Sequence, residues 1–146
     1  MVELGDEKVL YAFDKTLEPA LVVPSGTTVR VRTKDCFGNQ VQRPDDELDE
    51  IDWDHINPAT GPIFVEGAVP GGALKVTIEA IEFDGQTASC TGEGEGVCGD
   101  RFDAWSTHLC KIDGDELVWD EELRIPLRPM IGVIGCLLYT SDAADD

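Results

Sequence analysis

The sequence is short of basic residues and of histidine. Lys and Arg together number 11 against 30 Asp and Glu, and the only histidines are His55 and His108. The formal net charge of −19 disfavours nucleic acids and anionic membranes as partners, because both are polyanions. No apolar run is long enough to span a bilayer. The N-terminal residues show no basic patch followed by an apolar stretch, so we expect no signal peptide.

Cysteine pairs at metal-ligand or redox spacing are also missing. The five cysteines form no C-x-x-C pair and are odd in number; they are Cys36, Cys90, Cys98, Cys110 and Cys136. This favours free thiols and a cytoplasmic location. A thiol nucleophile is disfavoured too. Asp35 would disfavour the thiolate of its neighbour Cys36, and His108 would contact Cys110 only laterally along a strand.

Short apolar runs separated by turns predict a mainly β chain. Residues 9–13, 29–33 and 74–79 suit strands, and the last two alternate apolar and polar side chains with period two. Residues 117–119 and 123–127 suit further strands after a turn at 113–115, and 130–134 reads as a buried strand. We therefore predict a β-sandwich-like domain with irregular loops.

Two conspicuous polar stretches are assigned to loops. The acidic run at 43–54 lacks the Asp-x-Asp-x-Asp-Gly order of a calcium loop, so most of its carboxylates are expected to be solvated. The glycine-rich run at 91–99 carries two glutamates that would repel phosphate, and no Gly-Lys-Ser/Thr follows. We therefore exclude a nucleotide-binding loop.

The stretch 57–72 is the most constrained part of the chain. Prolines and glycines recur through it and surround one carboxylate, Glu66. Thr60-Gly61-Pro62, Val65-Glu66-Gly67-Ala68 and Pro70-Gly71, with Arg128 to Gly135 later on, resemble the signature of the acetamidase/formamidase family. This resemblance covers roughly residues 8–135. It implies hydrolysis of small linear amides, such as formamide and acetamide, to a carboxylic acid and ammonia.

Three side chains are candidates for a metal centre under this resemblance. Asp35 opens Asp35-Cys36-Phe37-Gly38-Asn39-Gln40, which resembles a family loop with Asn39 in place of a second glycine. His55 lies just before the signature, and Glu66 lies within it. One imidazole and two carboxylates can bind a divalent ion, zinc with calcium as the alternative, that polarises the amide and activates water. Asp35 and Glu66 are the candidate catalytic residues, and Gln40 is a candidate for binding the substrate amide.

Each of these residues also has a structural alternative. Asp35 can cap a turn, His55 can bond to Asp52 or Asp54, and Gln40 can bond only to loop backbone. A non-catalytic acidic β-sandwich binding module remains the alternative for the whole chain. Either form can be a homo-oligomer.

The sequence after Gly135 departs from the family pattern. Residues 136–146 resemble a translated adaptor, so we expect residues 1–135 to be an incomplete, N-terminal part of the family fold and 136–146 to be a non-native tail. The resemblance implies that further acidic and histidine motifs lie in the second half of the fold, and if the catalytic set is shared between the halves, we expect the chain alone to lack activity.

Overall fold

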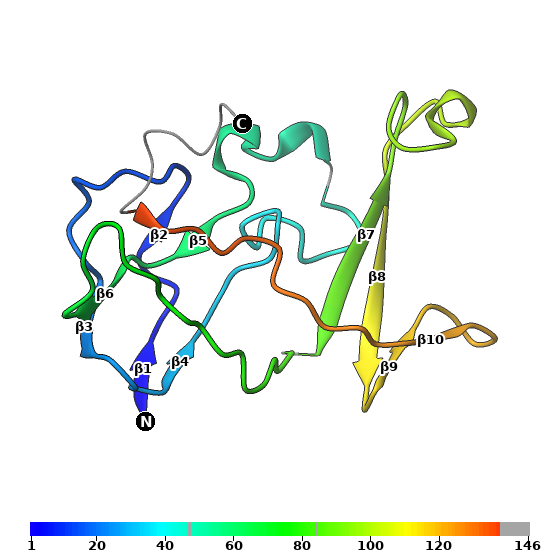
Figure 1. Ribbon diagram of the computed structural model, residues 1–146. Coiled ribbons are helices and arrows are strands. Elements are labelled where there is room, and N and C mark those ends of the chain that lie inside the picture. Colours follow the sequence, from blue (N-terminus) through cyan, green and yellow to red (C-terminus); the bar gives the residue numbers. More distant parts are fainter. Residues whose placement is uncertain (47, 84, 138–146) are drawn as a thin grey trace. The chain divides into compact units, whose positions relative to one another are not determined.

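The computed structural model describes residues 1–46, 48–83 and 85–137. The C-terminal part of the predicted tail, 138–146, lies outside these residues. The described chain forms short strands, three 3-10 helices and no α-helix (Figure 1). The prediction of a mainly β fold is confirmed. The described residues divide into two compact units, one drawn from 1–38, 54–77 and the segment after residue 130, and the other drawn from 39–53 and 78–130.

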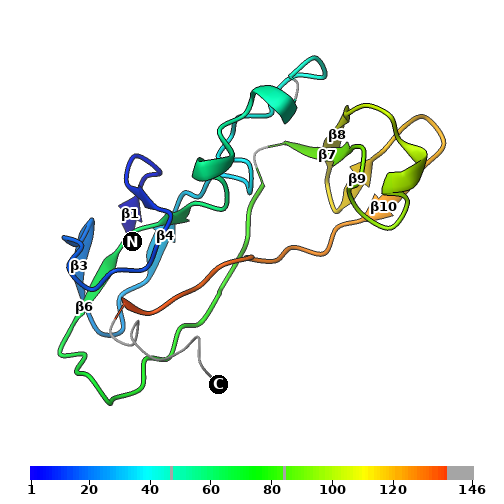
Figure 2. The same ribbon diagram turned by 90° about the horizontal axis from the view of Figure 1, so that it is seen from above.

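The described residues of the first unit form three two-stranded sheets. β3 and β6 run side by side in parallel, with Leu21 opposite Ile63 and Pro24 opposite Glu66 (Figure 2). β1 pairs with β4 in parallel, and β2 pairs with β5 antiparallel. The strands are β1 (Val2–Leu4), β2 (Val9–Leu10), β3 (Leu21–Pro24), β4 (Val29–Val31), β5 (Ala59–Thr60) and β6 (Ile63–Glu66). The expected strands at 9–13 and 29–33 are therefore present but shorter than predicted.

The second unit contains one antiparallel sheet in the order β10-β9-β8-β7 (Figure 1). β8 and β9 form a hairpin in which Asp113 faces Glu116, and Gly114 has a φ of 60°. Glycine adopts this left-handed conformation at little cost, which is why the turn forms at the predicted place. The strands are β7 (Gln86–Thr91), β8 (Ser106–Asp113), β9 (Glu116–Val118) and β10 (Arg124–Pro126). The 3-10 helices are η1 (Leu48–Glu50), η2 (Trp53–His55) and η3 (Gly99–Arg101).

Two predicted strands do not form. Residues 74–79 are not paired with any strand, and every residue from 71 to 80 is exposed. Residues 130–134, predicted to be a buried strand, are likewise unpaired and exposed. Sequence alternation shows which side chains share a face of a strand, but a strand is stable only when a neighbouring strand satisfies its backbone N–H and C=O groups. The described residues supply no such neighbour for either segment.

Few apolar side chains are fully buried. Among the described residues they are Val23, Val41, Leu48 and Cys110, each at most 5% exposed. Burial raises the pKa of the Cys110 thiol, which keeps it protonated and supports the prediction that it is no nucleophile. No helix in the described part of the chain is both long and apolar enough to cross a membrane.

Asp46 is an exception within the acidic run, since it is a structural residue. Its Oδ2 accepts hydrogen bonds from the backbone N–H groups of Gln42 (2.7 Å) and Arg43 (2.8 Å), while its Oδ1 accepts two from the Arg43 guanidinium. The Thr107 hydroxyl on β8 donates to the Asp46 carbonyl at 3.2 Å. The two backbone N–H groups, followed by the Arg43 side chain, lower the pKa of Asp46. The loop is therefore folded around this carboxylate.

We expect Asp46→Asn to lower the melting temperature at pH 7 but not at low pH. A carboxyl group whose pKa is lowered by folding stabilises the protein above its unfolded pKa, about 3.9, and this stabilisation is lost as the pH falls through the folded value. Thermal melts of wild type and variant from pH 7 to pH 2.5 measure the difference, which should shrink with acidification. Asp49→Asn, in the same run, is the matched control and should change little. A constant Asp46→Asn difference at every pH would show that the carboxylate charge has no role.

Candidate functional site

Glu66 sits at the corner of a tight turn. It ends β6, in which Ile63 and Val65 are half-buried while Phe64 and Glu66 are exposed. The Ala68 N–H donates to the Val65 carbonyl at 3.1 Å, and Gly67 between them has a φ of 80°. A four-residue turn with this φ at its third position is of type II and requires glycine there. The Glu-Gly order of the motif therefore holds the Glu66 carboxylate at the exposed end of a strand.

The Asp35 loop is also a glycine turn. The Gly38 N–H donates to the Asp35 carbonyl at 3.0 Å, and Gly38 and Asn39 have φ values of 68° and 63°. Asparagine is among the few non-glycine residues that adopt this region readily. Asn39 thus keeps the backbone conformation that a second glycine would allow. The Asp35 side chain is exposed.

His55 lies beside this loop. It ends η2, is exposed, and meets the Tyr11 ring edge-on with centroids 4.7 Å apart at 81°. Two residues later, the Asn57 N–H donates to the Cys36 carbonyl at 2.7 Å. This bond joins the segment after His55 to the loop that begins at Asp35. The structure therefore brings two of the three predicted ligands onto adjoining segments.

The three predicted ligands do not make a complete metal centre in this chain. Within residues 1–46, 48–83 and 85–137, no three His, Cys, Asp or Glu side chains are grouped as a metal ion requires. Glu66 belongs to the β6 turn, whereas Asp35 and His55 belong to the loops joined by Asn57. The donor types suit zinc, which accepts imidazole and carboxylate ligands. The positions of the three side chains do not suit zinc, so a metal centre that used them would need further ligands.

Gln40 uses its amide to hold a loop. Its Oε1 accepts from the Asp52 N–H at 2.7 Å, and its Nε2 donates to the Asp52 carbonyl at 3.2 Å. This is the structural alternative stated for Gln40 from the sequence. Its role in substrate binding stays a prediction.

The second histidine has a structural partner. The His108 Nε2 lies 2.7 Å from the Trp119 carbonyl oxygen, and its ring stacks on the Trp119 ring with centroids 4.3 Å apart. Sequence reasoning gave His108 no such role, because a histidine and a tryptophan eleven residues apart meet only through the β8–β9 hairpin. His108 is therefore a suitable control residue for His55.

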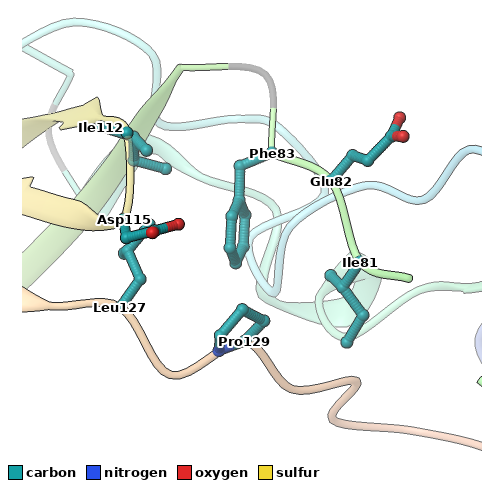
Figure 3. A pocket seen from close by; sticks show the side chains of 8 residues that line it. Ile81, Glu82, Phe83, Ile112, Asp115, Leu127 and Pro129 are labelled. Atoms are coloured by element: carbon teal, nitrogen blue, oxygen red, sulfur yellow. The ribbon is translucent and has the colours of Figure 1, made fainter. Parts of the chain in front are cut away.

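A pocket of about 330 Å³ lies in the second unit, away from the predicted ligands in sequence (Figure 3). Figure 3 shows the Phe83 ring between Ile81 and the β8–β9 turn, above Pro129. The lining residues are Ile81, Glu82, Phe83, Ile112, Gly114, Asp115, Leu127 and Pro129. It has no histidine, cysteine, lysine or arginine, so the charged side chains that line it are the Glu82 and Asp115 carboxylates, and it offers no cationic group to stabilise an oxyanion.

The chain matches the model of the acetamidase/formamidase family over residues 5–140. Among solved structures it is similar to an acetamidase from Bacillus halodurans (39% identity, TM-score 0.85). It is also similar to a recombinant predicted acetamidase/formamidase from the thermophile Thermoanaerobacter tengcongensis (43% identity, TM-score 0.84). Each alignment covers 90% of this chain but only 45% and 44%, respectively, of the relative's chain.

A more distant likeness shows the fold alone. An acetamidase from Yersinia enterocolitica is 17% identical with a TM-score of 0.62, over 86% of this chain and 43% of that chain. No curated protein matches the chain significantly. The chain spans about 45% of the length of the Bacillus halodurans acetamidase.

Proposed function

Since this chain belongs to the acetamidase/formamidase family, we propose that it is part of an enzyme that hydrolyses small linear amides to a carboxylic acid and ammonia. The observation that carries the proposal is the family match, which spans residues 5–140 and includes both sequence motifs. Formamide and acetamide are the proposed substrates. The proposed location is the cytoplasm.

We propose that Asp35, His55 and Glu66 contribute to the site only when the rest of the family fold is present. Two local features of the structure support this proposal. The Cys36–Asn57 hydrogen bond joins the Asp35 and His55 segments, and the Gly67 turn presents Glu66 to solvent. A divalent ion, zinc or alternatively calcium, is the proposed cofactor, with its remaining ligands outside this chain. Such an ion would supply charge to stabilise an oxyanion.

The proposed roles of this chain's side chains follow from amide chemistry. Amide hydrolysis needs a group that takes the proton from attacking water, and an exposed carboxylate such as Glu66 or Asp35 suits that role. Gln40 is the proposed contact for the substrate amide. Its Asp52 bonds would fix its orientation.

The experiment is an ammonia-release assay with formamide and acetamide. The chain alone is compared with the proposed full-length protein, in which the rest of the family fold would follow residue 135. We expect turnover only in the full-length protein, and a loss of about 100-fold or more in kcat/KM with Glu66→Gln. Glu121→Gln, another exposed glutamate, should leave the rate unchanged. Metal-free, inactive full-length protein would favour the alternative, a non-catalytic binding module.

A further inference from the structure

Residues 73–80 have the side-chain alternation of a strand, but no described strand pairs with them. Leu74, Val76 and Ile78 alternate with polar residues and are 54%, 61% and 49% exposed. A type II turn leads into the segment, in which the Gly72 N–H donates to the Val69 carbonyl at 3.0 Å and Gly71 has a φ of 81°. Figure 1 draws the residues after this turn as plain coil. The chain is thus directed into an amphipathic segment whose residues are all exposed.

The backbone N–H and C=O groups of this segment also pair with no described residue. Within the described part of the chain, residues 73–80 make no hydrogen bond through backbone or side chain. Exposed apolar alternation combined with open N–H and C=O groups is the combination that accepts an added β-strand. Residues 130–134 are likewise exposed and unpaired with any described strand; Met130 is 75% and Ile134 is 61% exposed.

Other features of the described residues also leave apolar surface uncovered. Among the described residues of the first unit, every sheet is two-stranded, and such pairs are marginally stable alone. Exposed apolar side chains also lie on β3 and β6, where Val22 is 54% and Phe64 is 46% exposed. More than half of the length of the two similar solved structures has no counterpart in this chain, although 90% of this chain aligns with them.

We propose that residues 73–80 form a β-strand that pairs with the second half of the family fold. That half is a better occupant than a second copy of this chain, because two chains of net charge −19 repel each other. The apolar row Leu74, Val76 and Ile78 would pack into the joint core while the backbone joins a strand ladder. Neither contact requires amide hydrolysis, so the inference stands apart from the proposed activity.

Hydrogen exchange at single-residue resolution tests this pairing. The full-length protein described above is compared with the chain alone. About every second amide from 74 to 80 should exchange on the order of 100-fold more slowly in the full-length protein, because a strand bonds its neighbour through alternate N–H groups. In the chain alone these amides should exchange freely at every protein concentration.

Proline substitutions supply the matched variants. Val76→Pro and Thr77→Pro remove N–H groups that point to opposite edges of a strand, so at least one should abolish the protection in the full-length protein. Val97→Pro is the control, because Val97 is a fully exposed valine in the glycine-rich loop. Fast exchange in both proteins would overturn the proposal. Slow exchange of these amides in the chain alone would also overturn it. If that slow exchange depended on protein concentration, it would show that the surface pairs with a second copy of the chain.

Discussion

Replacing Leu48 by alanine is expected to lower the free energy of unfolding by about 2–5 kcal/mol. Leu48 is 1% exposed, in a protein with few fully buried apolar residues among those described. Its carbonyl also accepts a hydrogen bond from the Trp53 indole N–H at 3.0 Å, which anchors the following helix η2. Removing the side chain loses its transfer free energy and leaves a cavity in the core.

Urea unfolding monitored by tryptophan fluorescence measures this change as a shift in the midpoint at constant slope. Leu74→Ala is the matched control in the chain alone, since Leu74 is 54% exposed there and its truncation should cost less than about 0.5 kcal/mol. Equal shifts for the two variants would mean that Leu48 is not the core residue that the structure shows.

The second large effect is expected at His55 in the full-length protein. If His55 binds the proposed divalent ion, His55→Ala should remove that ion and reduce kcat/KM by on the order of 100-fold or more, because loss of a residue that merely supports a ligand already costs about 10–100-fold. His55 is exposed beside Tyr11 and contributes little packing, so the variant should remain folded. Metal content after dialysis and steady-state ammonia release measure the two effects.

His108→Ala is the matched control because it removes the other histidine of the chain. The His108 ring is held by the Trp119 ring and carbonyl, so its loss should lower the melting temperature without changing metal stoichiometry. Equal metal content in wild type and His55→Ala would exclude His55 as a ligand. Activity would then have to be explained by other residues.

Local features of the fold were predictable from the sequence, whereas pairing was not. Glycines at 67, 71 and 114 carry the positive φ values that set the turns after β6 and between β8 and β9. Local sterics decide such turns, so they can be inferred from residue type. The strands expected at 74–79 and 130–134 failed for the opposite reason. Whether a strand forms depends on a partner elsewhere in the structure, and alternation carries no information about that partner.

The same distinction between local and non-local features applies to the candidate site. The exposed position of Glu66 follows from the glycine that succeeds it. The adjoining positions of Asp35 and His55 depend on one hydrogen bond between residues 36 and 57, which no local pattern specifies. The two bonds from Gln40 to Asp52 are equally non-local. Resemblance to a family supplied the candidate residues, but only the coordinates show which segments adjoin.

We propose that this chain supplies part of an amidase site that the rest of the family fold completes. Ammonia release from formamide by the full-length protein tests that claim most directly. We predict turnover that is absent from the chain alone and is lost with Glu66→Gln. Turnover by the full-length protein that survives Glu66→Gln, or no turnover with any small linear amide, would contradict it.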